Sequence, residues 1–542
     1  MPPQGLARPR SPLRLRAIRA MALLRSGWAR LKRVPWYRFA AGIAAGAPAL
    51  ALTFFMRILG LGVFLPEIAV DFTVGRIPGS IESFFIRTMG EGAKLLAIII
   101  ALVVFLVIPG FYALPYRWVQ KLVRNRWLVL ALYGLVPAAI TLFIVLPLLG
   151  GGFFGSLTAA GASGAAFSQI LSAFLSASFL DYFLVDVAAR HPEGFSLSRR
   201  QFIASVAILV AAGAVALTGL TSLVSRPARL VFASVPEMIS KEITPNDEFY
   251  VVTKNLFDPP VDAASWRLEI DGLVATRATY SLDDLGKRTD SQDEIATLEC
   301  VSNEVGGNLI STARWTGIPL ANLLAAAGVT PAADWVAFTC ADGYTVGVPL
   351  AKATNPSTMV ALQMNRDSLP SKHGGPARII VPGLYGMFHA KWVTRVTLVQ
   401  GAFFGFWQQK GWTNSEFAGT KERGAIRTTA IIATPAYNAV VSGPVTIGGV
   451  ALAGDRGIKR VEVSTDGGAS WAVATLKTPP LSNLTWVLWT FNWTPPGGGS
   501  YRIVARAFDN SVPPDDAQQS VPAPPFPDGA AGYDSIPLLV PG

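Results

Sequence analysis

The hydrophobic pattern changes character near residue 224 of this chain. Before that point, five apolar stretches each contain about twenty residues, the length that a helix needs to cross a bilayer. These stretches are Ala40–Leu65, Leu95–Leu114, Trp127–Leu149, Phe167–Val187 and Phe202–Leu223. The first contains Arg57, and the fourth ends in Asp181 and Asp186. We therefore expect a helical bundle of about five transmembrane spans over residues 40–223.

The remainder of the chain has short hydrophobic periods. A linker at residues 224–245 leads into mixed strand and helix patterns, such as Trp266–Ile270 with a turn at Asp271-Gly272. These patterns predict an α+β domain over residues 246–425. From Ile426 onward the chain contains only short strands and turns, which predicts an all-β sandwich over residues 426–542.

The net charge of +11 is concentrated at the N-terminus. Ten Lys and Arg and no acidic residue lie within Met1–Arg38, which leaves +1 for all other residues. Nucleic-acid binding needs cations spread over a folded face, so this charge indicates a basic cytoplasmic tail at residues 1–39 and no nucleic-acid partner.

The loops between the spans indicate an orientation. Cytoplasmic loops collect Lys and Arg. The loop between spans two and three carries Arg117, Lys121, Arg124 and Arg126. The Ile68–Glu91 loop, in contrast, holds more acid than base. The expected protein is a multi-pass cell-membrane protein with its N-terminus inside and everything after Leu223 on the extracytoplasmic, periplasmic side.

A pair of arginines precedes the fifth span. The run Ser198–Phe202 contains Arg199 and Arg200 and is followed by an apolar stretch, as in an internal twin-arginine export signal. Export of a domain that already contains its cofactor requires such a route. The alternative is that the two arginines only anchor a helix at the inner membrane face.

The candidate chemistry lies in three segments, namely TLECVSNEVGG with Cys300, STARWTGIPL, and SKHGGPARIIVPGLYGMFHAKW. Together they resemble the catalytic domain of the sulfite oxidase family of molybdenum enzymes, over about Asn246–Phe417. The region after it resembles that family's immunoglobulin-like C-terminal domain, which makes a homodimer contact. The resemblance implies Mo-molybdopterin, a molybdenum ion on a pyranopterin, as the cofactor and Cys300 as its metal ligand. The alternatives are a buried thiol or a disulfide with Cys340.

The same resemblance implies residues that bind the pterin. They are Lys254, Asn255, Asp342, His373, Arg378, His389, Ala390 and Lys391. Arg378 interrupts an apolar strand, where an unpaired guanidinium is costly to bury, so we expect it to bind an anion unless it faces water at a sheet edge. Asp342 is also consistent with an ordinary Asp-Gly turn. Leu256 replaces the family's histidine.

Three residues concern the substrate. Glu304 comes after the cysteine where sulfite oxidases place arginines, and its charge would repel sulfite. Counting from Trp407 puts Trp412 in the position of the family's active-site tyrosine, so Trp412 is a candidate catalytic residue and no phenol is expected there. Arg314 is a candidate replacement cation, or else a solvated residue at a helix edge.

The sequence thus predicts a membrane-anchored molybdopterin-dependent oxidoreductase that transfers an oxygen atom to or from a small substrate containing sulfur. The three histidines, His191, His373 and His389, lie outside the spans, so no bis-histidine haem is expected between the helices. Electrons would pass to a separate carrier, a cytochrome or a quinone. The alternative class is a non-catalytic membrane-bound partner module that retains the fold, and a transporter is disfavoured because the spans lack paired buried charges.

Overall fold

A computed structural model of the chain describes residues 36–89, 92–158, 160–187, 229–255, 257–413, 415 and 422–542. These residues form two compact units. The first comprises Met1–Thr73 and Lys94–Leu220, and the second comprises Val74–Ala93 and Thr221–Gly542. The predicted fifth span, the twin-arginine motif and nearly all of the basic tail lie outside the described residues.

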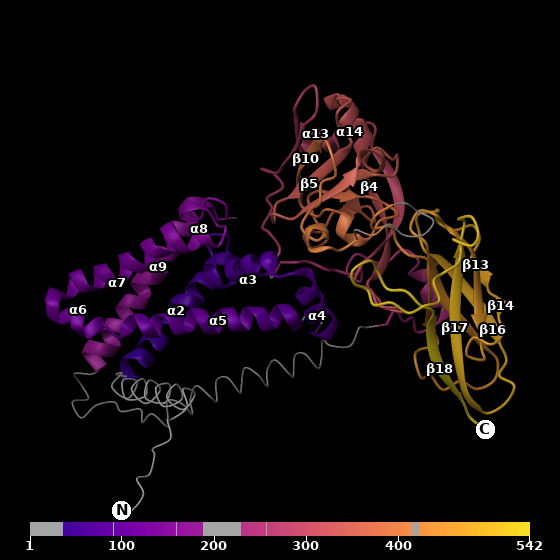
Figure 1. Ribbon diagram of the computed structural model, residues 1–542, viewed down its shortest axis with the longest axis horizontal. Coiled ribbons are helices and arrows are strands. Elements are labelled where there is room, and N and C mark those ends of the chain that lie inside the picture. The colour runs from indigo at the N-terminus through magenta and orange to yellow at the C-terminus, as the bar shows by residue number, and fades with distance from the viewer. Residues whose placement is uncertain are drawn as a thin grey trace, which may run out of the picture. The chain divides into compact units, whose positions relative to one another are not determined.

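The first unit consists of apolar helices (Figure 1). They are α2 (Trp36–Ile58), α5 (Gly92–Ala113), α6 (Tyr116–Val123), α7 (Arg126–Ile140), α8 (Leu146–Leu148) and α9 (Gly161–Asp181), with α3 (Leu65–Arg76) shared between the units. Four stretches are long and apolar enough to cross a membrane, namely Trp36–Ile58, Gly92–Val123, Arg126–Leu148 and Gly161–Asp186. This result confirms the first four predicted apolar spans and supports membrane association.

Large apolar side chains on these helices are exposed, as lipid-facing positions require. Examples are Ile100 on α5, Trp127 on α7 and Phe167 on α9. The helices also approach one another closely, because a Cβ atom on Gly42 of α2 would lie 2.2 Å from the backbone oxygen of Pro109 in α5. Small residues at such contacts are typical of packed membrane helices.

The charged residues within the predicted spans are paired. Arg57, at the end of α2, donates to Glu67 of α3 at 2.8 Å. Asp181 is buried at the end of α9, where it accepts hydrogen bonds from Tyr116 and from Arg126 at 2.5 and 2.6 Å. Arg126 also contacts Asp186 at 2.8 Å. Pairing explains why apolar stretches tolerate these side chains, and it corrects the expectation that the spans lack paired buried charges.

The second unit contains one mixed and one antiparallel sheet, which confirm the predicted strand-rich α+β region. One has the order β2-β1-β10-β5-β6, in which β1 and β10 are parallel and the other pairs antiparallel. Its strands are β1 (Arg267–Gly272), β2 (Ala278–Ser281), β5 (Trp335–Cys340), β6 (Thr345–Pro349) and β10 (Val393–Val399). The other has the order β3-β4-β7-β8, with β9 paired to β7. Its strands are β3 (Gln292–Glu299), β4 (Ile310–Pro319), β7 (Met359–Met364), β8 (Asp367–Ser368) and β9 (Arg378–Ile380).

Short helices accompany these sheets. They are α13 (Leu282–Gly286), α14 (Leu320–Ala327) and α15 (Leu350–Ala353). A further helix, α4 (Gly79–Met89), belongs to this unit although it precedes α5 in the chain. A large core of buried side chains joins both sheets, with Leu268 of β1, Ile318 of β4 and Ile379 of β9 among its members.

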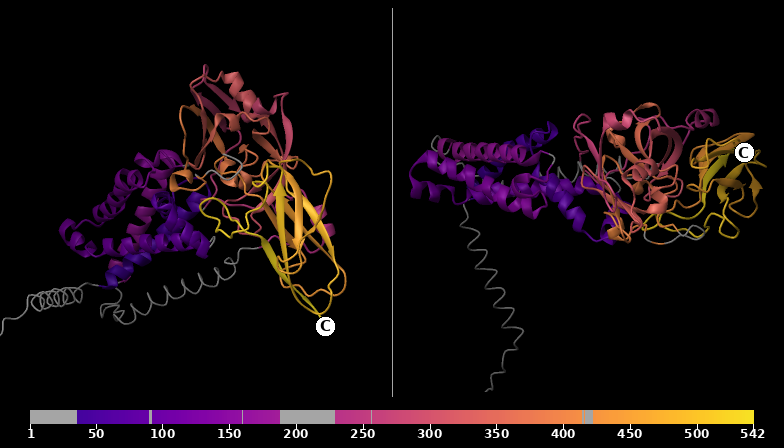
Figure 2. Two further views of the ribbon diagram at one scale, coloured as in Figure 1. Left: turned by 45° about the vertical axis from the view of Figure 1, so that its right-hand side comes forward. Right: turned by 90° about the horizontal axis from the view of Figure 1, so that it is seen from above.

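The C-terminal region is a β-sandwich, as predicted. Its two antiparallel sheets have the orders β11-β12-β16-β15 and β14-β13-β17-β18. The strands are β11 (Thr429–Thr434), β12 (Val445–Leu452), β13 (Ile458–Ser464), β14 (Ala472–Val473), β15 (Thr475–Leu476), β16 (Val487–Trp493), β17 (Gly499–Asp509) and β18 (Asp534–Val540). Buried side chains from both sheets share one core, and the C-terminus lies at one end of the strands (Figures 1 and 2).

The described part of the predicted linker, from Arg229, is folded. It contains α12 (Val235–Ser240), whose Met238 is fully buried. Phe232 donates its backbone N–H to the oxygen of Ala433 in β11, and Arg229 pairs with buried Asp534 of β18 at 2.7 Å. The segment that precedes the α+β domain in the chain is therefore held against the sandwich by these contacts.

Candidate functional site

Cys300 lies immediately after β3, in the tight connection to β4. Its backbone N–H donates to Leu309 at 2.9 Å, and its backbone oxygen accepts from Asn303 at 2.9 Å. The side chain is buried, with Sγ 2.9 Å from the hydroxyl of Ser302. Neither Cys300 nor Cys340 forms a disulfide, although both are buried. The connection thus holds a reduced thiol at a fixed position.

Two tyrosines lie beside this thiol. Burial raises the pKa of Tyr250 well above its usual value, and the neighbouring thiol of Cys300 raises it further. Burial also raises the pKa of Tyr344, with Cys340, Asp342 and Cys300 adding to the effect. The Tyr344 hydroxyl donates to the backbone oxygen of Met387 at 2.7 Å. Both phenols stay protonated at neutral pH, and the sequence motifs predicted neither of them.

Arg378 begins β9 and is buried, as its apolar surroundings indicate. Its Nη1 donates to the backbone oxygen of His373 at 3.0 Å, and its guanidinium lies 5.5 Å from the ring centre of Trp315. Among the described residues its Nε has no hydrogen-bond partner. Burial lowers the Arg378 pKa to about 10. A buried guanidinium of this kind is stabilised by an anion, and the edge-strand alternative is excluded by its burial.

Three predicted pterin-binding residues meet around one carboxylate. Lys254 donates to the backbone oxygen of Asp342 at 2.9 Å, and its Nζ is 3.6 Å from Asp342 Oδ2. The Asn255 amide donates to the same Oδ2 at 2.9 Å. Asp342 also forms the expected turn, because its Oδ1 accepts from the backbone of Tyr344. The turn is therefore present, and pterin binding by Asp342 stays a prediction.

Both predicted histidines are buried and bonded to backbone. The Nε2 of His373 is 2.6 Å from the oxygen of Asn246. The Nδ1 of His389 accepts from the backbone of Val381 at 3.2 Å, and its Nε2 is 3.1 Å from the oxygen of Leu384. Both ring nitrogens of His389 thus stabilise the loop after β9, and the predicted pterin contact of this segment stays a prediction.

The neighbours of His389 run alongside β9. The backbone oxygen of Ala390 accepts from Ile379 at 2.9 Å. The Nζ of Lys391 lies 4.3 Å from the ring centre of Trp392 and contacts the oxygen of Lys372 at 3.5 Å. Lys391 and Lys254 both lower the otherwise raised pKa of buried Cys340, as does Arg378, so the three cations surround the end of β5.

Acidification is expected to destabilise this domain. Burial lowers the pKa of His373 to about 4 and that of His389 to about 3, from 6.5. Below pH 6.5 the unfolded chain binds protons that the folded domain excludes, so the free energy of unfolding falls as the pH falls toward these values. Each histidine contributes on the order of 3 kcal/mol to this loss by pH 4.

Glu299 has the opposite effect on how the free energy of unfolding depends on pH. Burial raises its pKa to about 7, so its stabilising contribution is greatest at low pH and is lost as the pH rises through 7. Denaturant unfolding of Glu299→Gln between pH 7 and 4.5 should therefore show a steeper loss of stability than the wild type. Glu248→Gln, at an exposed position, is the matched control. Equal slopes for Glu299→Gln and wild type would contradict this assignment.

Neither of the two predicted catalytic residues other than Cys300 has a described contact with that thiol. Trp412 is buried, stacks on Trp407 with ring centres 4.3 Å apart, and donates its indole N–H to Ser83 at 3.1 Å. Arg314 lies in β4, not at a helix edge, and pairs with Asp293 of β3 at 3.2 Å. No described contact joins Arg314 to the group around Cys300.

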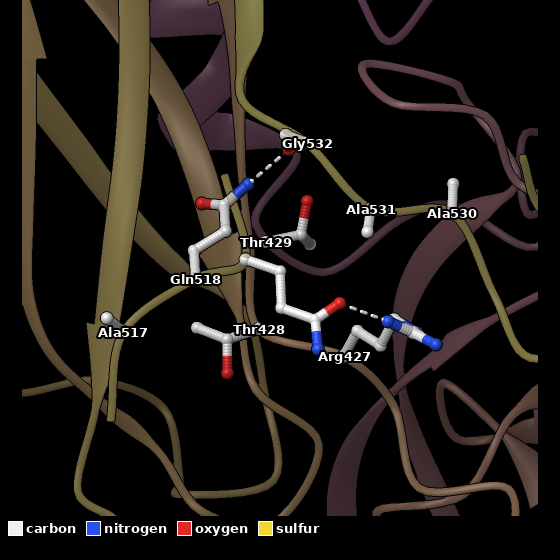
Figure 3. Close-up of a pocket in the computed structure, with 9 residues that line it drawn as sticks. Arg427, Thr428, Thr429, Ala517, Gln518, Ala530, Ala531 and Gly532 are labelled. Carbon is white, nitrogen blue, oxygen red and sulfur yellow. Dashed lines mark hydrogen bonds between the residues drawn. The ribbon is translucent and has the colours of Figure 1, made fainter. Parts of the chain in front are cut away.

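A pocket in the C-terminal sandwich is separate from this group (Figure 3). It is lined by Arg427, Thr428, Thr429, Ala517, Gln518, Gln519, Ala530, Ala531 and Gly532. The Gln518 amide donates to Gly532 at 2.8 Å, and Arg427 donates to Gln519 and, at 2.9 Å, to the oxygen of Asp528. None of the residues predicted for the site lines this pocket, so the candidate site is the cluster around Cys300.

Two family models match the chain. The model described as oxidoreductase molybdopterin binding domain matches residues 256–407. The model described as Mo-co oxidoreductase dimerisation domain matches residues 423–522. The first contains Cys300, Asp342, Arg378 and Lys391, and the second covers most of the sandwich.

Individual proteins give a consistent result. Sulfite oxidase of Gallus gallus is 31% identical over 317 residues, which cover 50% of this chain and 68% of that protein. A putative protein-methionine-sulfoxide reductase subunit of Azospira oryzae is 30% identical over 152 residues, which cover 28% of this chain and 56% of that protein. The sulfane dehydrogenase SoxCD of Paracoccus pantotrophus aligns in structure with a TM-score of 0.45 and 21% identity, over 58% of this chain and 88% of that chain. This chain spans 59% of the length of the mammalian mitochondrial sulfite oxidases that it matches.

Proposed function

The chain belongs to the sulfite oxidase family of molybdopterin-dependent oxidoreductases, and we propose that it is a membrane-anchored enzyme that transfers an oxygen atom to or from a small sulfur-containing substrate. One observation carries this proposal. Cys300, a buried thiol outside any disulfide, lies in the same domain as Arg378, a buried arginine whose Nε has no hydrogen-bond partner among the described residues.

The residues around Cys300 fit Mo-molybdopterin. In the part of the chain that the structure describes, no group of three His, Cys, Asp or Glu side chains could hold a metal ion. A metal at Cys300 would therefore need its remaining ligands from a cofactor, and the pyranopterin dithiolene provides them. Arg378 suits the cofactor's phosphate, and Lys254 and Lys391 add positive charge nearby.

The cofactor, when bound, supplies oxygen-atom transfer coupled to a two-electron change at the metal. The protein's own groups orient it and manage protons. Asp342 fixes Lys254 and Asn255, so that the lysine and amide are held in place before binding. Tyr250 remains protonated at neutral pH and is available as a hydrogen-bond donor, whereas the Tyr344 hydroxyl already donates to the backbone oxygen of Met387.

Glu304 bears on the choice of substrate. It lies four residues after Cys300 and is partly buried, and burial raises its pKa while Arg87 lowers it. A carboxylate here disfavours a sulfur oxyanion such as sulfite. The Azospira oryzae relative, named as a methionine-sulfoxide reductase subunit, favours reduction of an S-oxide as the second candidate activity.

Glu304→Gln is expected to raise kcat/KM for sulfite with an artificial acceptor by about three- to tenfold, because it removes a like charge from the substrate's approach. Reduction of neutral S-oxides by a reduced dye should change less than about twofold. The control is Asp515→Asn, which removes a charge from an exposed loop of the sandwich. An unchanged kcat/KM for sulfite in Glu304→Gln would place the carboxylate outside the substrate's path.

We place the catalytic domain outside the cytoplasm. Helix α4 lies in the loop between the first two spans and pairs with Lys410 of the catalytic domain, which supports a common side for both. The basic residues between the second and third spans support the opposite side for their own loop. Electrons would then pass to a separate cytochrome or quinone. Labelling of a cysteine introduced at exposed Val512, by a membrane-impermeant maleimide on intact cells, tests this orientation.

We also propose a homodimer formed through the C-terminal sandwich. Support comes from the match of residues 423–522 to a dimerisation domain. Light scattering of the detergent-solubilised protein, corrected for bound detergent, should give twice the chain mass of 57.7 kDa. A single-chain mass at micromolar concentration would contradict the dimer.

A further inference from the structure

Helix α4 contacts the catalytic domain through two buried polar interactions. The Lys410 ammonium pairs with the Glu82 carboxylate at 2.5 Å, and the two side chains are 7% and 11% exposed. One position further along α4, Ser83 accepts the indole N–H of Trp412 at 3.1 Å. Both Ser83 and Trp412 are buried. Buried polar groups keep such partners because an unmade bond in this environment is costly.

The backbones at this contact are in close approach. A Cβ atom on Gly79, the first residue of α4, would lie 2.1 Å from the backbone oxygen of Lys410. The Lys410 ammonium also approaches the preceding segment, at 2.5 Å from the oxygen of Val74. Ile86 packs against the main hydrophobic core of the catalytic domain. The contact between α4 and the catalytic domain therefore combines a close backbone approach, a buried ion pair and apolar packing.

Lys410, which contacts α4, is linked through aromatic rings to residues predicted to bind the cofactor. The Lys410 ammonium lies 4.7 Å from the ring centre of Phe406 and 5.2 Å from that of Trp407. Phe406 in turn lies 6.1 Å from the Tyr344 ring and 5.7 Å from the Lys254 ammonium. A continuous set of contacts thus runs from α4 through Lys410 and Phe406 to residues beside Cys300.

The distal end of α4 carries Arg87, about one turn beyond Ser83 in a helix of about 3.6 residues per turn. The charge of Arg87 lowers the pKa of Glu304, which burial raises. Glu304 belongs to the connection that carries Cys300, so a charge on α4 acts on the segment of that thiol.

We propose that α4 is a wall of the substrate site, and that Glu82 and Ser83 are positioning residues that hold Lys410 and Trp412 in place. The inference rests on the proposed function, because the site is that of the proposed oxidoreductase. The segment of this loop that forms α4 is then part of the active site. Substrate selection would depend on this loop.

Hydrogen exchange on the full-length protein tests the contact without reference to turnover. Lys410→Met keeps the length of the side chain but leaves Glu82 without its partner, so α4 amides should exchange about tenfold faster than in the wild type. The matched control is Lys352→Met, because Lys352 is equally buried and pairs with Asp455. Unchanged α4 exchange in Lys410→Met would overturn the proposal.

Kinetics test the positioning role. Ser83→Ala should raise KM by about three- to tenfold with a smaller change in kcat, because the Trp412 indole loses the hydroxyl that accepts its N–H while molybdenum content stays constant. Ser83→Thr should restore KM. Thr88→Ala removes a hydroxyl from the same helix, one that bonds the α4 backbone at Phe84, and should have no effect. Equal KM values for Ser83→Ala and Thr88→Ala would overturn the positioning role.

The results of these experiments distinguish failure of this inference from failure of the proposed function. If the enzyme contains molybdenum and turns over but neither α4 exchange nor KM responds, the wall proposal fails and the enzyme assignment stands. If the protein contains no molybdenum when made in a host that supplies the cofactor, the enzyme assignment fails. The exchange experiment would still report whether Lys410 holds α4.

Discussion

Cys300→Ser is expected to abolish turnover, with a loss of at least about a thousandfold, equivalent to about 4 kcal/mol of transition-state stabilisation. A serine oxygen is a harder and weaker donor than the thiolate that a molybdenum ion prefers. The fold should persist, because the connection after β3 is held by backbone bonds to Leu309 and Asn303 that serine retains. Steady-state assay together with metal and pterin analysis measures both effects.

Cys340→Ser is the matched control for the thiol. Cys340 ends β5 and is not in a disulfide, and burial raises its pKa well above the ordinary value, so it is poorly suited to act as a thiolate ligand. We expect less than about a tenfold effect on turnover. If Cys300→Ser kept full cellular function, the alternative of a non-catalytic partner module would replace the enzyme assignment.

Arg378→Met is expected to have opposite effects on the cofactor-free and the loaded protein. In cofactor-free protein, methionine removes a buried guanidinium whose Nε has no partner among the described residues, which should raise the free energy of unfolding by about 1–4 kcal/mol. In cells that supply the cofactor, pterin content should fall at least about tenfold, because the phosphate loses its buried cation. Thermal unfolding and pterin analysis of both forms measure the two effects.

Arg456→Met provides the contrast. Arg456 is partly exposed, at 13%, and pairs with buried Asp509 at 2.9 Å in the sandwich, so its loss leaves a buried carboxylate and should destabilise the protein by about 3–5 kcal/mol. Pterin content per folded chain should be unchanged. If Arg378→Met instead destabilised the cofactor-free protein as Arg456→Met does, Arg378 would have a structural role and not an anion-binding one.

Local features of the sequence predicted much of the fold. Apolar length alone located the four described spans, because a bilayer sets the length of any helix that crosses it. Short hydrophobic periods located the α+β and sandwich regions, because alternate strand residues must face a core. The pairing of Arg57 with Glu67, and of Arg126 with Asp181, was not predictable, since each depends on how separate helices pack.

Some features of the candidate site could likewise be predicted from the sequence, and others could not. The family resemblance suggested Cys300 as the metal ligand and Lys254, Asn255 and Asp342 as pterin-binding residues, and these roles stay predictions. The structure brings the last three together, although 87 residues separate Asn255 from Asp342. Spacing also suggested Arg314, whose pairing with Asp293 comes from strand register that the motif does not reveal. Tyr344 could have been noticed in the segment that contains Asp342. Tyr250 carried no local signal.

The sequence by itself determined the family, the thiol that identifies the site and the division into apolar helices and strand-rich domains, since each depends on residue type and short-range spacing. Only the tertiary structure decided what surrounds that thiol. Trp412 meets Ser83 across 329 positions, and Tyr250, which precedes β1, donates its backbone N–H to Ser311 of β4 at 3.2 Å, because burial brings distant residues together regardless of their separation in sequence.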